Sequence, residues 1–346
     1  MSDHRVAFIG TGAEPENPSA TGFAMAYQHA DAYLQIDGCD LVGCADIVPE
    51  NAAAFAEEYS IGDEHVYTEY QEMLDGVEPD IVSICVPPHA HAELAINTAR
   101  HEAVDAIHCE KPMALTWGGA REMAEVAAEE DVQLTFNHQR RFADLFRTAK
   151  ARLDEGVIGD LEQVQYTWGN FYDNGTHAID MCNYFNDETP AEWVLGGLDY
   201  REEKLIFGTH NENQMLAHWE YENGVHGLAA TGVGSAFMDA DWRMIGADGR
   251  IDVFLGEMKL EVIAGGETTV EEFTRGPWIP RAIADVVAAL DEDRPCELRA
   301  ENALNATEII FGGYESVRTR SRVELPPEID DNPLAAMVDS GSLNPQ

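Results

Sequence analysis

The sequence has 346 residues, of which 64 are acidic and 21 are lysine or arginine, so its formal net charge is −43. A hydrophobic content of 45% and an aromatic content of 9% are typical of a globular protein, and this length is sufficient for two domains that each bury a core. The strong negative charge argues against nucleic acid and anionic membranes as partners, because both carry the same sign of charge.

The acidic residues are spread along the whole chain, and only four basic residues are lysines, namely Lys111, Lys150, Lys204 and Lys259. Such a composition resembles an adaptation to high cytoplasmic salt, which screens the repulsion between neighbouring carboxylates. An acidic surface for a basic partner would more often be a local patch. We therefore expect a halophilic protein.

Targeting signals and cysteine pairs are missing from the sequence. No segment approaches the ~20 consecutive apolar residues of a membrane span, and the first five residues lead directly into a predicted strand without the apolar region of a signal peptide. The six cysteines include no Cys-x-x-Cys pair, so we interpret them as reduced, buried and structural. The expected location is cytoplasmic.

Strands and helices alternate in the first part of the chain. The apolar runs predict strands over 5–9, 41–45, 81–86, 105–109 and 133–136, with helices over 22–36, 51–59, 70–74, 91–100 and 116–130. Alternation of this kind is typical of a parallel, doubly wound α/β sheet. We place this first domain at residues 1–138.

The pattern changes after Arg141, where a helix over 143–155 precedes long strands separated by glycine-containing turns. Strands are predicted over 161–168, 204–209, 214–221, 225–231, 242–246, 250–254 and 259–263, with helices over 280–290 and 300–318. Such turns predict an antiparallel sheet and an α+β domain over 139–325. The Pro- and Asp-rich tail, 326–346, is expected to be loosely ordered.

The first strand is followed at once by Gly10-Thr11-Gly12, the context that a dinucleotide-binding turn requires. The third glycine of that pattern would fall on Pro15, which cannot serve, so an insertion of about nine residues moves the role to Gly22. A tight turn without a ligand is the alternative. Asp46 ends the second strand, where a carboxylate can bind ribose hydroxyls and would repel a 2′-phosphate. NAD is therefore favoured over NADP.

Lys111 lies where the apolar run that ends at Cys109 meets Pro112. The proline disfavours a helical backbone at Lys111, and a lysine can polarise or exchange a substrate proton where an arginine cannot. The alternative is an ordinary strand end with a solvated lysine.

The segment 173–180 holds a second candidate site. In a helix from about residue 176, His177 and Asp180 share one face, and Asp173 caps the start. A histidine held by carboxylates is a suitable general acid or base, because its ordinary pKa is near neutrality. The alternative is a capped helix with a polar face. No third ligand is nearby, so no metal is expected.

Four segments in order resemble motifs of the glucose-fructose oxidoreductase, inositol dehydrogenase and rhizopine-catabolism (Gfo/Idh/MocA) family. They are Pro87-Pro88-His89-Ala90-His91, with proline in place of the family's asparagine, Glu110-Lys111-Pro112, Gln139-Arg140-Arg141-Phe142, and Asp173-x-x-x-His177-x-x-Asp180. The resemblance covers roughly residues 5–325. The inserted glycine loop and a short segment between Trp168 and Asp173 depart from the family pattern.

The resemblance implies a Rossmann domain joined to an open-faced sheet that often pairs subunits, hence a homodimer or homotetramer. His177 would take the substrate hydroxyl proton, Lys111 would stabilise the developing alkoxide and Asp173 would orient both. Implied cofactor contacts come from Gly10, Gly12, Gly22, Asp46, Pro87, His91 and Glu110, and implied substrate contacts from Arg140, Asn170, Trp168 and Tyr172.

Three functions remain compatible with these residues. The first is an NAD-dependent sugar or polyol dehydrogenase, which moves a hydride from a secondary hydroxyl to nicotinamide. The second is a glycosidase that uses NAD in a transient oxidation. The third is a non-catalytic NAD-binding regulator, against which the intact Lys111, Asp173 and His177 argue.

Overall fold

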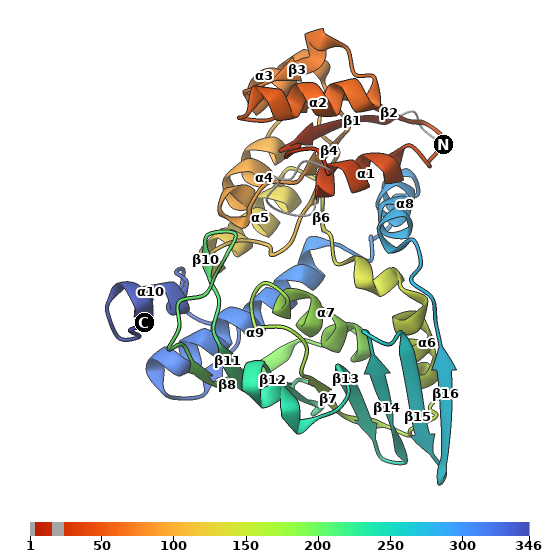
Figure 1. Cartoon of the computed structure of the whole chain (residues 1–346), viewed down its shortest axis with the longest axis vertical. Coiled ribbons are helices and arrows are strands. Elements are labelled where there is room, and N and C mark those ends of the chain that lie inside the picture. Colours follow the sequence, from red (N-terminus) through yellow and green to blue (C-terminus); the bar gives the residue numbers. More distant parts are fainter. Residues whose placement is uncertain (1–3, 16–23, 346) are drawn as a thin grey trace. The chain divides into compact units, whose positions relative to one another are not determined.

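The computed structural model describes residues 4–15 and 24–345 and divides the chain into two compact units (Figure 1). The first unit contains residues 1–114, 119–139 and 277–301. The second contains residues 115–118, 140–276 and 302–346. Residues 277–301 therefore return to the first unit, whereas the sequence pattern had placed them with the second.

The first unit contains a six-stranded sheet in the order β3-β2-β1-β4-β5-β6, and all its strand pairs are parallel. The strands are β1 (His4–Ile9), β2 (Cys39–Ala45), β3 (Val66–Tyr67), β4 (Ile81–Ile84), β5 (Ala106–Cys109) and β6 (Gln133–Phe136). Strands β4 and β5 are buried at every position, as continuous apolar runs in a parallel sheet require. The predicted doubly wound sheet is confirmed.

Helices flank this sheet (Figure 1). They are α1 (Met25–Tyr33), α2 (Pro49–Tyr59), α3 (Tyr70–Val77), α4 (His91–Ala99), α5 (Trp117–Glu129) and α8 (Trp278–Asp291). One core cluster joins Phe8 of β1, Tyr33 of α1 and Phe55 of α2 with Ile283 and Val287 of α8. The late helix α8 thus completes the core of the first unit.

The second unit contains a nine-stranded sheet in which only β7 and β12 pair in parallel among the described strands. Its order is β16-β15-β14-β13-β7-β12-β11-β8-β17. The strands are β7 (Leu161–Tyr166), β8 (Ala191–Asp199), β11 (Gln214–Tyr221), β12 (His226–Ala230), β13 (Trp242–Gly246), β14 (Gly249–Phe254), β15 (Lys259–Ala264), β16 (Glu267–Glu272) and β17 (Val323–Glu324). A mostly antiparallel sheet is thereby confirmed.

Helices α6 (Asp144–Asp154), α7 (Gly175–Phe185) and α9 (Ala300–Thr319) lie on one face of this sheet (Figure 1). Burial alternates along β11, where Met215 and Ala217 are buried and Leu216 is exposed. This period of two is typical of an antiparallel strand with one covered face.

Strand β8 is absent from the sequence-based prediction because Gly196 and Gly197 interrupt its apolar pattern. The structure explains Gly196, since a Cβ there would lie 2.7 Å from the carbonyl oxygen of Gly313 in α9. The glycine lets the helix approach the strand. The strand predicted over 204–209 is instead two short strands, β9 (Leu205–Ile206) and β10 (Thr209–His210), which pair only with each other.

The chain after Pro326 is more ordered than expected. Helix α10 (Pro333–Asp339) begins after Asn332, whose side-chain oxygen accepts hydrogen bonds from the backbone N–H groups of Leu334 and Ala335. The Asn332 amide also donates to the carbonyl of Leu115 at 3.0 Å. An N-cap and a buried Leu334 stabilise the short helix, which the polar composition concealed.

The six cysteines all carry free thiols, as the sequence suggests. Within residues 4–15 and 24–345, the structure contains no helix that combines the length and hydrophobicity needed to cross a membrane.

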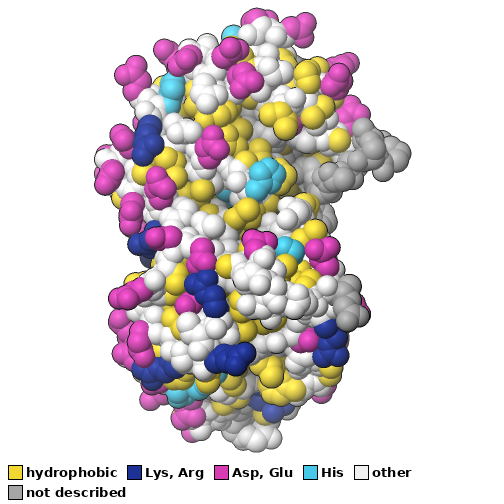
Figure 2. Space-filling model, turned by 90° about the vertical axis from the view of Figure 1, so that its left-hand side faces the viewer, with side chains coloured by type: hydrophobic (Ala, Val, Ile, Leu, Met, Phe, Trp, Pro, Cys, Tyr) yellow, Lys and Arg dark blue, Asp and Glu magenta, His cyan; other side chains and the backbone are white. Residues whose placement is uncertain are grey.

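Acidic side chains lie scattered over the face drawn in Figure 2, with fewer lysines and arginines among them. Reducing KCl from molar concentration to about 0.1 M, where the Debye length is roughly 10 Å, is expected to lower the melting temperature by about 5 °C or more. Exposed carboxylates repel one another more strongly when screening weakens. Scanning fluorimetry across a KCl series measures the effect, and a flat melting temperature would contradict it.

Candidate active site

The glycine turn follows β1 at the point where the strand order reverses between β1 and β4. In doubly wound sheets this reversal opens a ligand crevice at the carboxyl ends of the strands. Gly10 and Gly12 both have positive φ, 82° and 66°. A Cβ at Gly10 would lie 2.3 Å from the Val86 side chain, so only glycine fits there. Gly22 lies outside the described residues.

Asp46 holds the glycine turn directly. Its Oδ2 accepts hydrogen bonds from the backbone N–H groups of Thr11 and Gly12, both at 2.9 Å, and Oδ1 accepts one from Val48 at 2.9 Å. The carboxylate is almost fully buried. Asp46 therefore fixes the conformation of the turn. The sequence analysis predicted only that its carboxylate binds ribose hydroxyls.

His91, a predicted cofactor contact, is fully buried between two backbone carbonyls. Its Nδ1 lies 2.7 Å from the oxygen of Pro112, and its Nε2 lies 2.9 Å from that of Val86. Burial lowers the pKa of His91. The ring therefore braces the loop after β4, which contains Pro87, against the loop after β5.

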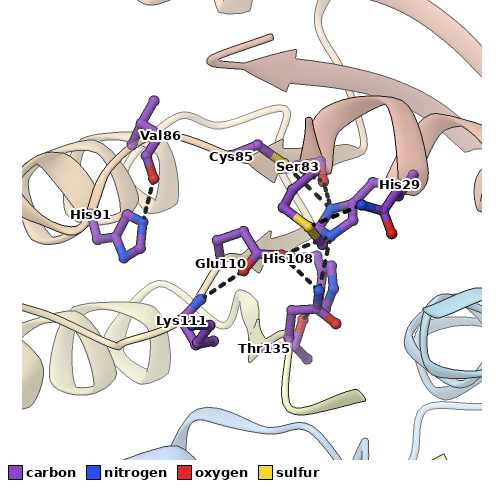
Figure 3. A network of polar contacts seen from close by, with 12 residues as sticks. His29, Ser83, Cys85, Val86, His91, His108, Glu110, Lys111 and Thr135 are labelled. Atoms are coloured by element: carbon purple, nitrogen blue, oxygen red, sulfur yellow. Dashed lines mark hydrogen bonds and ion pairs between the residues drawn. The ribbon is translucent and has the colours of Figure 1, made fainter. Parts of the chain in front are cut away.

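Glu110 forms the centre of a buried polar network at the end of β5 (Figure 3). Its Oε1 lies 3.1 Å from Nε2 of His29 and accepts a hydrogen bond of 2.7 Å from the amide of Asn137. The other oxygen accepts the backbone N–H of Lys111 at 3.2 Å. One carboxylate thus fixes the backbone from which the candidate catalytic lysine projects.

Glu110 remains ionised in this network. Burial alone would raise the pKa of Glu110, but the hydrogen bonds and charge of His29, together with Asn137 and Lys111, lower it below the ordinary value. Burial likewise opposes the charged form of His29, yet Cys85 and Glu110 raise the pKa of that imidazole. Since the folded pKa of Glu110 lies below the ordinary 4.5, its contribution to stability is present above that pH and is lost as the pH falls further.

The sequence analysis missed His29 and Asn137 as members of this site. His29 lies three residues after Ala26 and four before Tyr33, both of them buried in α1. A histidine in the apolar stripe of a helix is the signal that could have indicated a buried polar partner.

In the second unit, helix α7 begins at Gly175, and its N-cap residue is Asn174, whose side chain makes no capping hydrogen bond. The expectation that Asp173 is the N-cap is therefore wrong. His177 occupies the first turn of α7 and is buried. Asp173, also buried, precedes the helix, and its backbone N–H donates to the Asn211 side chain at 3.2 Å.

The turn before α7 is held by side chains rather than by strand pairing. Asn170 is buried, and its side-chain oxygen accepts the Asn174 backbone N–H at 2.7 Å. Glu212, fully buried, accepts the backbone N–H of Phe171 at 2.7 Å and the hydroxyl of Tyr314 at 2.6 Å. These contacts fix the segment that presents Asp173 and His177.

Asp180 binds Arg141 of the Gln139–Phe142 turn. The guanidinium donates to both oxygens of Asp180 at 2.9 and 2.6 Å, and to Glu188 at 2.6 Å. Arg141 and Asp180 are 2% and 1% exposed. The sequence grouped Asp180 with His177 on a functional face, whereas the structure gives this carboxylate a buried ion pair.

Arg140 and Trp168 are adjacent in the second unit. The guanidinium carbon of Arg140 lies 4.0 Å from the centre of the Trp168 ring, and both side chains are half-buried. Tyr172 is instead buried and packs against Phe311 of α9, with ring centres 6.1 Å apart. Of the two aromatic side chains predicted to stack on a sugar, Tyr172 is thus buried, whereas Trp168 is half-buried.

The predicted site residues form two groups. Gly10, Gly12, Asp46, Pro87, His91, Glu110 and Lys111 belong to the first unit, and Arg140, Trp168, Asn170, Tyr172, Asp173 and His177 to the second. Among the described residues, no group of three or more histidine, cysteine, aspartate or glutamate side chains is arranged to hold a metal ion.

Residues 4–138 match the oxidoreductase family with an NAD-binding Rossmann fold, Gfo/Idh/MocA. The segment 4–138, nearly all of which lies in the first unit, is therefore similar to the Gfo/Idh/MocA oxidoreductases.

Known proteins are similar to different lengths of the chain. D-glucoside 3-dehydrogenase of Escherichia coli is 32% identical over 160 residues, which are 45% of this chain but only 41% of that protein. Myo-inositol 2-dehydrogenase of Thermotoga maritima is 25% identical and covers 70% of this chain and 73% of its own. An Agrobacterium radiobacter oxidoreductase, solved with NAD⁺, L-tartaric acid and magnesium, has a TM-score of 0.77 at 16% identity over 93% of this chain and 98% of that one, a likeness of fold alone.

Proposed function

We propose that the protein is an NAD-dependent dehydrogenase that oxidises a secondary hydroxyl of a sugar, a polyol or a derivative of one. The observation that carries this proposal is the buried Glu110, which accepts the backbone N–H of Lys111 at the carboxyl edge of the first sheet. The glucoside and inositol dehydrogenases among the relatives support the substrate class.

The residues present fit a dinucleotide. Among the described residues beyond its chain neighbours, no atom lies within 4 Å of the position that a Cβ of Gly12 would take, so these residues leave room for a phosphate, and Asp46 lies beside the turn. When bound, NAD supplies nicotinamide C4 as the acceptor of the hydride. His177 accepts the proton of the substrate hydroxyl, Lys111 stabilises the negative charge that develops on that oxygen, and Asp173 orients both side chains.

Asp46 makes NAD the preferred cofactor in this proposal, because its carboxylate repels a 2′-phosphate. The exposed Ile47 and Val48 follow it, with no arginine to bind that phosphate. Replacement of Asp46 by alanine is expected to raise the KM for NAD by about 10–150-fold, which corresponds to the loss of ~1.5–3 kcal/mol of charge-assisted hydrogen bonding. The KM for NADP is expected to change less. The exposed Asp40→Ala on β2 is the control. A higher kcat/KM with NADP in the wild type would contradict the assignment.

A substrate screen in molar KCl tests the function itself. Polyols, aldoses, sugar acids and glycosides are incubated with NAD, and both absorbance at 340 nm and glycoside cleavage are recorded. Stoichiometric NADH formation supports the dehydrogenase. Cleavage without net NADH would favour the transient-oxidation glycosidase, and NAD binding without either reaction would favour the regulator.

A further inference from the structure

Arg140 is joined to the segment of the candidate base by a stack of aromatic rings. Its guanidinium lies 4.0 Å above Trp168, whose ring is stacked on Trp242 with centres 5.8 Å apart. The indole N–H of Trp242 donates to the carbonyl of Ala178 at 3.1 Å, and Ala178 follows His177 in α7. In the second unit, Arg140 and the half-buried ring of Trp168 are thus connected through Trp242 to the helix that contains His177.

This guanidinium has no carboxylate partner, although the chain contains 64 acidic residues. Among the described residues, Nε of Arg140 is buried and has no hydrogen-bond acceptor, and no ion pair involves the side chain. Asp241 acts on Arg140 through its charge, but its Oδ2 already accepts the backbone N–H of Leu255 at 2.7 Å. The neighbouring Arg141, in contrast, binds two carboxylates.

The surroundings of Arg140 favour an incoming anion. Burial lowers the pKa of Arg140 to about 10, the charge of Arg275 lowers it further in the same sense, and Asp241 only partly opposes them. A guanidinium over an aromatic face, with no carboxylate bound among the described residues, leaves donors that an oxyanion satisfies by charge-assisted, bidentate hydrogen bonds. A tryptophan face beside a cation also suits the apolar face of a sugar ring.

We propose that Arg140, with Trp168, binds an oxyanion on the substrate, so that the protein acts on sugar acids or sugar phosphates in preference to neutral sugars. Arg140 is then a residue that determines specificity, separate from the proton-transfer group. The kinetic test of this inference rests on the proposed dehydrogenase function, whereas binding of the anion can be measured without turnover.

The test compares wild type, Arg140→Gln and the matched control Arg147→Gln. Arg147 is also half-buried beside aromatic rings, 4.8 Å from that of Phe142, and its loss changes the net charge equally. Binding of D-glucuronate, D-galacturonate and D-glucose 6-phosphate is followed by tryptophan fluorescence against D-glucose and D-galactose, at constant KCl. NADH formation gives kcat/KM for the same compounds, and for other neutral and acidic pairs from the screen.

The wild type is expected to bind or oxidise at least one anionic sugar about tenfold or more better than its neutral counterpart. The carboxylate and phosphate arms show which oxyanion is preferred. Arg140→Gln should lower the affinity or kcat/KM for the anionic sugar by about 10–100-fold. It should change the affinity or kcat/KM for the neutral sugar by no more than about threefold, whereas Arg147→Gln should resemble the wild type for both sugars.

Several results would overturn the inference. These are equal use of neutral and anionic sugars by the wild type, an equal loss for both in Arg140→Gln, or no binding of any anionic sugar. A raised KM for NAD with unchanged sugar preference would also overturn it, because it would place Arg140 at the cofactor pyrophosphate. Arginine-dependent binding of a sugar acid without NADH formation would support this inference while contradicting the proposed dehydrogenase.

Discussion

Replacing His177 by alanine is expected to lower kcat on an oxidised sugar or polyol by about 10²–10⁴-fold, with the KM for NAD close to that of the wild type. Hydride transfer from an alcohol requires a proton acceptor at the hydroxyl oxygen, and His177 is held at the first turn of α7 by the anchored segment before it. Lys111→Ala should lower kcat by at least about 10²-fold, because the alkoxide loses its cation. Steady-state kinetics with saturating NAD measures both effects.

The pH profile separates a base from a structural residue. A histidine accepts a proton only in its neutral form, so wild-type kcat should fall at acidic pH, and this acidic limb should flatten in His177→Ala. His65→Ala, in the first unit and with a half-buried side chain, is the control. Near wild-type kcat in His177→Ala would assign the base elsewhere, with Lys111 the next candidate. A complex in which the Lys111 and His177 side chains are more than about 10 Å apart would contradict a shared site.

Replacing Asp180 by alanine is expected to lower the free energy of unfolding by about 3–5 kcal/mol, because it leaves the guanidinium of Arg141 buried with one partner fewer. Burial opposes the charge of Arg141, whereas Asp180 and Glu188 raise its pKa well above the ordinary value. Urea denaturation followed by circular dichroism measures the loss.

An exposed ion pair supplies the comparison for Asp180. Arg201, whose side chain is 78% exposed, pairs with Asp199 at 2.9 Å, and Arg201→Ala should leave the free energy of unfolding nearly unchanged. Replacing Arg141 and Asp180 together by methionine and leucine should cost less than Asp180→Ala alone, since the buried guanidinium is removed with its most buried partner and only Glu188, whose side chain is 20% exposed, loses an ion pair. A double variant as unstable as the single one would show that packing, rather than charge, makes this contact important.

The first sheet could be predicted closely because its strands are buried on both faces and therefore appear as continuous apolar runs, as in Ile81–Ile84. Strand β8 could not be predicted, because its Gly196 is required by the close approach of α9. This tertiary contact cannot be inferred from the local sequence. Helix α10 was missed for a similar reason, because its stability comes from the Asn332 cap and from burial of Leu334.

The candidate site shows the same division. Motif spacing indicated Glu110, Lys111, Asp173 and His177, because each lies in a short motif that is visible in the local sequence. The partners that hold them, His29 and Asn137 around Glu110, lie 81 and 27 residues away in the chain. Spacing alone also could not show that Asp180 binds Arg141. The His177-x-x-Asp180 spacing is the same whether Asp180 shares a functional helix face with His177 or forms a buried ion pair.

The return of residues 277–301 to the first unit has a consequence for biosynthesis. Ile283 and Val287 of α8 fill the core that Phe8 and Tyr33 begin, so a nascent chain ending near residue 139 exposes part of that core. At ~5–20 residues per second, the ribosome supplies the missing helix only after roughly 7–30 seconds more of synthesis. The first unit therefore begins the chain but cannot finish folding until residues 140–276 of the second unit have been synthesised, and a recombinant fragment of the first unit needs α8 grafted onto its end.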